Sequence, residues 1–153
     1  MPPASRGIRD EAMAGYPSVR LTAFPYMSGF LKQLGIEVFR GDHTFLCREC
    51  SEKSGTDGSG FGSMINEAGV RTLVKLISVV DDSNTVRRCG EDTARKSRLA
   101  ALELCEDKTL ESDTPAYFDR VKQLDKEYIK ARVSPGGCAD LLAITYFLVF
   151  SCS

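Results

Sequence analysis

The chain has 153 residues, of which 42 % are hydrophobic and 27 % charged, values ordinary for one globular domain with its own core. The formal net charge of −1 gives no reason to expect a nucleic-acid partner. A single histidine, His43, excludes a histidine-rich metal centre, and we expect residues 1–153 to form a single helical domain.

The first part of the chain predicts one helix after a frayed start. Residues 1–14 are polar and mixed, and they lack the apolar run of a secretory signal, so we expect a cytoplasmic protein with reduced cysteines. Glycine and proline within residues 15–20 predict a turn. Residues 19–34 then carry apolar side chains at spacings of three and four, which is typical of an amphipathic helix that stops at Gly35.

Residues 36–62 predict a long loop, because they are rich in glycine, serine and aspartate. The spacing of His43, Cys47 and Cys50 resembles half of a zinc site, but a structural zinc ion needs four ligands. A redox Cys-x-x-Cys usually opens a helix after a strand, which is not the context here. We expect a mobile loop that binds no zinc, with a metal or redox role as the alternative.

Helical spacing of apolar residues returns over residues 63–80 and 91–106. After a polar connector, Thr114 is expected to cap a helix that begins at Pro115 and reaches about Ala131. The last helix is expected over residues 138–150. Its apolar run is too short to span a bilayer, so we expect no membrane partner. The predicted class is all-α: about five helices in a bundle or orthogonal array, with a long Gly/Ser-rich loop.

The stretch from Ser134 to Asp140 carries the first candidate site. Ser134 is suited to cap a helix, Pro135 suits its first position, and Gly136 and Gly137 then expose bare amides. Each glycine costs roughly 1 kcal/mol of helix stability relative to alanine, so close approach of an anion such as phosphate is one explanation. Asp140 would then need a cation such as Mg²⁺ between itself and the anion. The alternative is an ordinary capped helix.

A second candidate site follows the apolar helix 63–80. Asp81, Asp82 and Asn84, with two neighbouring hydroxyl side chains, form an oxygen-rich cluster that suits Mg²⁺. Arg87 and Arg88 suit phosphate groups. The alternative is a turn that leads into a helix N-cap, since aspartate, serine and asparagine are common capping residues.

Several blocks of sequence belong together. In chain order they are Gly15-Tyr16-Pro17-Ser18-Val19-Arg20, Asp82-Ser83-Asn84…Arg88-Cys89-Gly90, Leu124-Asp125-x2-Tyr128-Ile129 and Ser134-Pro135-Gly136-Gly137-Cys138-Ala139-Asp140-Leu141-Leu142-Ala143. Taken in this order, the blocks resemble the triphosphoribosyl-dephospho-coenzyme A synthase family. That family transfers a triphosphoribosyl group from ATP to 3′-dephospho-CoA and releases adenine, which makes the prosthetic-group precursor of citrate lyase and malonate decarboxylase. The family fold is all-helical.

The resemblance leads to a hypothesis of a transferase that displaces adenine at the ribose anomeric carbon. Its substrates would be ATP and 3′-dephospho-CoA, with Mg²⁺ as the cofactor. The proposed catalytic residues are Asp82 and Asp140. The proposed nucleotide-binding residues are Arg20, Asn84, Arg88, Ser134, Gly136 and Gly137. The proposed magnesium ligands are Asp81, Asp82 and Asp140.

The chain also departs from the family pattern. The resemblance covers only the C-terminal half of a typical member, and the family's Pro-Lys-Pro-Gly and Asn-Thr-His-Lys-Gly blocks do not occur. Cys138 stands where the family usually has serine, Cys89 where it has glycine, Arg87 where histidine is common, and residues 40–62 resemble an insertion. We therefore expect an exposed apolar surface that a missing N-terminal half or a second copy would cover. The alternative function is a non-catalytic helical protein that binds a protein partner.

Overall fold

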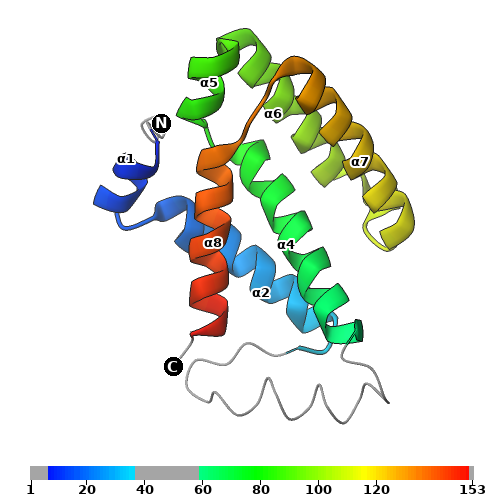
Figure 1. Cartoon of the computed structure of the whole chain (residues 1–153). Coiled ribbons are helices and arrows are strands. Elements are labelled where there is room, and N and C mark those ends of the chain that lie inside the picture. Colours follow the sequence, from blue (N-terminus) through cyan, green and yellow to red (C-terminus); the bar gives the residue numbers. More distant parts are fainter. Residues whose placement is uncertain (1–6, 37–58, 152–153) are drawn as a thin grey trace.

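A computed structural model describes residues 7–36 and 59–151, and this part of the chain is all-α with no strands (Figure 1). It holds seven α-helices, one π-helical segment and one 3-10 turn. They are α1 (Ile8–Met13), η1 (Val19–Ala23), α2 (Phe24–Gln33), α4 (Ser59–Val79), α5 (Ser83–Cys89), α6 (Glu91–Glu106), η2 (Lys108–Leu110), α7 (Thr114–Ala131) and α8 (Gly136–Phe150). The predicted all-α class is confirmed, whereas the predicted number of helices is too low.

The two additional helices, α1 and α5, are too short to show a helical repeat in the sequence. The α1 helix packs through the side chain of Ile8, and its Glu11 is buried and accepts the backbone N–H of Ser18 at 3.1 Å. The α5 helix begins after Asp82 and ends at Cys89, where the C-cap residue Gly90 has a φ of 84° that favours glycine. Tertiary contacts rather than periodicity therefore define both helices.

The helix expected over residues 19–34 is present, but its first turns are π-helical and α2 ends at Gln33. The N–H of Phe24 donates to the carbonyl of Val19, five residues earlier. Pro25 follows at the start of α2, where it has no N–H to give to the helix ladder. A wider turn at this point agrees with the usual place of π-helical segments inside longer helices.

Two other expected boundaries are wrong. The α4 helix begins at Ser59, so the last four residues of the expected loop are helical; His43, Cys47 and Cys50 lie outside the described residues. Thr114 does not cap α7, because Asp113 is the N-cap residue and its Oδ1 accepts the N–H of Ala116 at 3.0 Å. The hydroxyl of Thr114 donates instead to Glu67 Oε1 of α4, at 2.8 Å.

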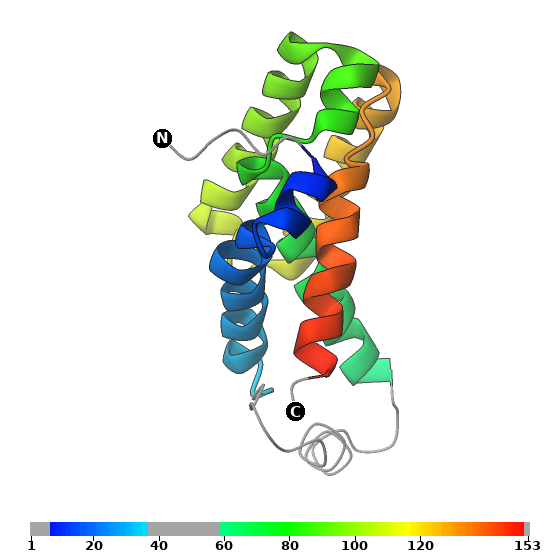
Figure 2. The same ribbon diagram turned by 90° about the vertical axis from the view of Figure 1, so that its left-hand side faces the viewer.

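The α4 helix lies at the centre of the fold (Figure 1). On one side it packs with α6 and α7, around Val74, Ala101 and Leu104. On the other side it packs with η1, α2 and α8, and Figure 2 shows α2 and α8 side by side. Gly69 permits this packing, because a Cβ there would lie 1.6 Å from the hydroxyl oxygen of Tyr146.

The α8 helix is apolar around most of its circumference, and within residues 7–36 and 59–151 it is covered on one side only. Leu141, Thr145 and Val149 are buried, whereas Phe147 is 68 % exposed and Phe150 is 45 % exposed. None of the helices in residues 7–36 and 59–151 has the length and apolar character needed to cross a membrane. The exposed side of α8 therefore presents two aromatic side chains, and an apolar surface covered by a missing half or a second copy stays a prediction.

Candidate functional site

The start of α8 is organised by a carboxylate from another part of the chain. The helix begins at Gly136 rather than at residue 138, and Pro135 is its N-cap residue, so Ser134 does not cap it as predicted. Asp82 takes that role: its Oδ2 accepts the N–H of Cys138 at 3.2 Å. Its Oδ1 accepts the N–H of Asn84 at 2.9 Å and so caps α5. One carboxylate therefore caps two helices.

Gly137 provides the space that this carboxylate needs. A Cβ at Gly137 would lie 3.2 Å from the carboxylate carbon and from both oxygens of Asp82, closer than almost all Cβ contacts. A Cβ at Gly136 would lie 3.6 Å from Asn84 Nδ2, which is an ordinary contact. The sequence predicts that a group approaches the backbone here, and within the described structure that group is Asp82.

The start of α8 is a buried and acidic environment. Asp82 is 8 % exposed and Glu11 of α1 is 3 % exposed. Burial is the main cause that raises the pKa of the Cys138 thiol, followed by the nearby charges of Asp82 and Glu11. The Cys138 side chain is therefore a neutral, buried thiol and not a nucleophilic thiolate.

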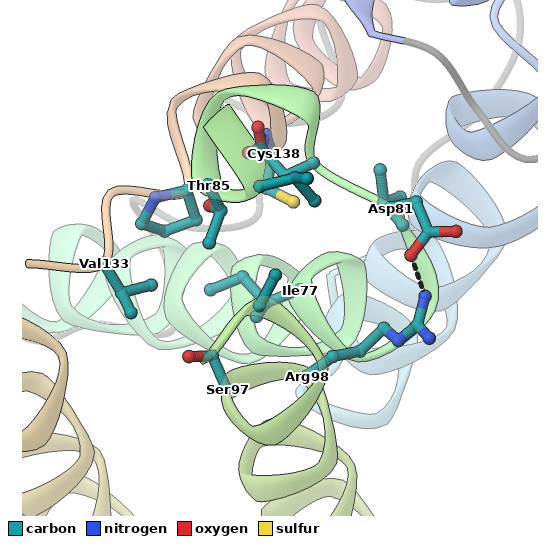
Figure 3. Close-up of a pocket in the computed structure, with 12 residues that line it drawn as sticks. Ile77, Asp81, Thr85, Ser97, Arg98, Val133 and Cys138 are labelled. Carbon is teal, nitrogen blue, oxygen red and sulfur yellow. Dashed lines mark hydrogen bonds and ion pairs between the residues drawn. The ribbon is translucent and has the colours of Figure 1, made fainter. Parts of the chain in front are cut away.

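A small cavity of about 20 Å³ lies beside Asp82, between the end of α4, α5, the start of α6 and the segment before α8 (Figure 3). Its volume is close to that of a single water site. Asp81 and Arg98 form an ion pair at one side of it. Thr85 lies toward the other side, where its hydroxyl donates to the carbonyl of Ser134 at 3.1 Å. Contacts from Asp82 and from α5 thus hold the α8 start in place.

The structure brings together only some of the residues predicted from the sequence. Those gathered at the α8 start are Asp82, Asn84, Ser134, Gly136 and Gly137. Ser134 contributes through its carbonyl.

The four other predicted residues lie away from the α8 start or contact other groups of the same chain. Asp81 pairs with Arg98, and Arg20 Nε donates to the carbonyl of Gly15 at 2.6 Å. Arg88 is exposed in the last turn of α5, and Asp140 is exposed in the second turn of α8. Neither Arg88 nor Asp140 lines the cavity beside Asp82.

The predicted magnesium ligands do not converge on a metal site in the described residues. Within residues 7–36 and 59–151, no group of three or more His, Cys, Asp or Glu side chains is arranged to hold a metal ion. Both oxygens of Asp82 accept backbone N–H groups, and Asp81 faces the guanidinium of Arg98. We therefore derive no chemical step through a resident metal, and a magnesium role for Asp81, Asp82 and Asp140 stays a prediction.

Sequence reasoning missed Arg98, Glu11 and the hydroxyl of Thr85. Arg98 lies on a helix whose charged residues all resemble a solvated face. Glu11 belongs to the polar N-terminal stretch, and nothing in its neighbours signals burial. Only Thr85 had a sequence signal, since it lies inside the oxygen-rich cluster.

Comparison with known proteins was made by family model and by structure. A family model described as ATP:dephospho-CoA triphosphoribosyl transferase matches residues 56–151, which is more than half of the chain. No solved structure matches the chain. The matched range includes α4 to α8 and therefore every residue of the site around Asp82 except Glu11.

Proposed function

The chain belongs to the ATP:dephospho-CoA triphosphoribosyl transferase family, and from this we propose that it takes part in that reaction. The proposed activity is transfer of a triphosphoribosyl group from ATP to 3′-dephospho-CoA with release of adenine. The product would serve the prosthetic group of citrate lyase or malonate decarboxylase. The observation that carries the proposal is the family match over residues 56–151, which includes the site around Asp82.

We propose that the α8 start is where the triphosphate is held. The first two amides of α8, those of Gly136 and Gly137, and the positive end of its dipole favour an anion, whereas Asp82 already accepts the third amide and places a negative charge beside them. Gly136 has room around its Cα. Arg87 and Arg88 on α5 and Arg132 before α8 are exposed arginines close in sequence to the two sides of the site, and Arg20 is exposed on η1. Asp82 would act by fixing the positions of Asn84 and the glycine amides.

Asp140 is the carboxylate proposed to act on the bound nucleotide. It is exposed one turn beyond the glycines, whereas Asp81 and Asp82 are engaged with protein groups. ATP binds Mg²⁺ through its phosphate oxygens, so a carboxylate beside the triphosphate would contact the ion that the nucleotide carries. Without that ion, Asp140 would repel the triphosphate.

Adenine release tests the proposal directly. Purified chain is incubated with ATP, Mg²⁺ and 3′-dephospho-CoA, and free adenine is measured by chromatography. We expect adenine only when both substrates are present, and at least a hundredfold lower rate for Asp140→Asn with an unchanged circular dichroism spectrum. Asp119→Asn, which removes an exposed carboxylate on α7 outside the blocks that resemble the family, is the matched control. Adenine release that does not require 3′-dephospho-CoA, or no release at all, would exclude transferase activity of this chain alone.

A second candidate function is binding of a protein partner. The observation that favours it is the exposed apolar side of α8, where Phe150 also stacks on Tyr146 with 5.9 Å between ring centroids. Exposed aromatic groups on one helix face are typical of interaction surfaces. The two functions are compatible, because the Asp82 site lies at the opposite end of α8.

A further inference from the structure

A groove separate from the Asp82 site lies around Arg71, where α2, α4, the end of α6 and the start of α7 meet. Two cavities of about 480 Å³ and 270 Å³ adjoin there, and both are lined by Tyr26, Arg71 and Glu111. The larger one falls within the roughly 300–1,000 Å³ that small-molecule sites occupy. By volume, this groove is a better ligand site than the cavity beside Asp82.

Arg71 is held rigidly at the floor of the groove. It is only 5 % exposed, and its guanidinium carbon lies 3.9 Å from the ring centroid of Tyr117 and 5.2 Å from that of Phe30. Its Nε donates to Glu67 Oε1 at 3.0 Å, and one Nη donates to the carbonyl of Leu110 at 3.4 Å. These bonds use two of the guanidinium's N–H donors, and the group lines both cavities, so further donors are available to a ligand.

The charges of the groove argue against an anionic ligand. Arg71 is already paired with Glu67. The other charged residues that line the larger cavity are one lysine, Lys108, and three acidic residues, so negative charge is in excess there. A triphosphate would therefore find no excess positive charge there. Besides Arg71, the Tyr26 hydroxyl and the Glu111 carboxylate are hydrogen-bonding groups on residues that line both cavities, and the apolar walls include Leu104 and Phe30. This lining suits an uncharged chain that carries both methylene groups and amides.

The groove and the Asp82 site lie along the same pair of packed helices, α4 and α6. Arg71, Lys75 and Ser78 share one face of α4, because they are spaced by four and three residues. Ser78 Oγ lies 4.0 Å from the thiol of Cys105 on α6, and the Asp81–Arg98 ion pair follows on the same two segments. Ten residues of helix span about 15 Å, so an extended ligand could reach from one site to the other.

We propose, on the basis of the proposed function, that the groove around Arg71 binds the pantetheine arm of 3′-dephospho-CoA. The arm is uncharged and carries two amides, so its carbonyl oxygens would accept from Arg71 and Tyr26 and an amide N–H would donate to Glu111. Its methylene groups would lie against the apolar walls. The charged adenosine end would then extend along the α4–α6 seam toward Asp82.

Calorimetric titration with pantetheine, which lacks the nucleotide, tests this inference. We expect wild-type chain to bind pantetheine, and Tyr26→Phe and Glu111→Gln each to weaken pantetheine and 3′-dephospho-CoA by about tenfold while Mg-ATP affinity stays unchanged. Both substitutions preserve side-chain shape, and Glu103→Gln on the exposed surface of α6 is the matched control. No pantetheine binding by wild type, or equal binding by both variants and wild type, would overturn the inference.

The outcome is separable from that of the proposed function. If the chain releases adenine while the KM for 3′-dephospho-CoA is the same in wild type, Tyr26→Phe and Glu111→Gln, the groove assignment is wrong and the transferase function stands. If pantetheine binds and both variants weaken it, but no adenine is released, the groove assignment stands and the transferase function of this chain fails.

Discussion

The contact between Asp82 and Gly137 makes a quantitative prediction about stability. Asp82→Ala removes the cap of α5, worth about 0.5–2 kcal/mol, and leaves the N–H of Cys138 without its charged acceptor, worth about 1.5–3 kcal/mol. Removal of a carboxylate that is only 8 % exposed offsets part of this loss, because burial of a charged group is itself unfavourable. We expect the free energy of unfolding to fall by about 2–4 kcal/mol, measured by urea denaturation at pH 7.

A double-mutant cycle with Gly137→Ala isolates the contact itself. In wild type, the new methyl group would lie 3.2 Å from the Asp82 carboxylate, so the gain in helix propensity of about 0.5–1 kcal/mol is cancelled or outweighed by crowding. In the Asp82→Ala background the crowding is absent, and Gly137→Ala should stabilise by that amount. The coupling energy between the two sites should therefore be on the order of 1 kcal/mol.

Two controls make the cycle decisive. Gly136→Ala meets Asn84 Nδ2 at 3.6 Å and should have the same effect in both backgrounds. Asp81→Ala removes only a partly exposed ion pair with Arg98, so it should cost at most about 1 kcal/mol. Equal effects of Gly137→Ala with and without Asp82, within about 0.3 kcal/mol, would refute the claim that Gly137 exists to admit this carboxylate.

Three further predictions follow from buried groups and from the exposed side of α8. Gly69→Ala should lower the free energy of unfolding by about 1–3 kcal/mol, because its methyl group displaces Tyr146. Gly62→Ala should raise the free energy of unfolding by up to about 1 kcal/mol, because the described structure leaves open space around Gly62. Urea denaturation measures both effects. Burial raises the pKa of the Cys105 and Cys138 thiols above their ordinary value of 9.0. As pH rises, the unfolded chain therefore loses these protons before the folded chain does. The free energy of unfolding should fall above about pH 9, by up to about 1.4 kcal/mol per pH unit for each thiol. If the free energy of unfolding of Cys138→Ala fell with the same slope as that of wild type, this assignment would be wrong. Sedimentation should show self-association of wild type at micromolar concentration that Phe147→Lys removes, while a monodisperse wild-type monomer would show that the exposed side of α8 needs no partner.

The long helices could be predicted from the sequence because their apolar repeats extend over several turns. Residues 91–106 were predicted as a helix, and α6 has those bounds. For α7 the end at Ala131 agrees with the prediction, but the cap does not: both Asp113 and Thr114 are good capping residues, and the choice depends on Glu67 of α4, which accepts the threonine hydroxyl. A contact 47 residues away is not visible in the local pattern.

The candidate site was predictable in its parts but not in its arrangement. The two glycines at a helix start predict a close approach to the backbone, and Asp82 makes one at Gly137 but not at Gly136. The Asp82 segment is recognised separately as an N-cap or ligand cluster. The hydrogen bond between Asp82 and the N–H of Cys138 could not be predicted, because the two residues are 56 positions apart in the sequence. The packing of α8 on α4 and α5 brings them together. Arg98 was missed for the same reason: its partner Asp81 is 17 residues earlier, on a different segment.

The position of Asp82 also constrains the chemistry at the α8 start. Its carboxylate already binds the third amide of the helix, so an incoming anion would meet the amides of Gly136 and Gly137 directly beside a negative charge. Repulsion between two such charges in a partly buried site amounts to several kcal/mol, more than the helix dipole offers. A triphosphate that binds here must therefore bring a cation or draw on arginines such as Arg88, because the helix terminus by itself is already neutralised. On this argument Gly136 and Gly137 position the nucleotide, and its charge is balanced by groups outside α8.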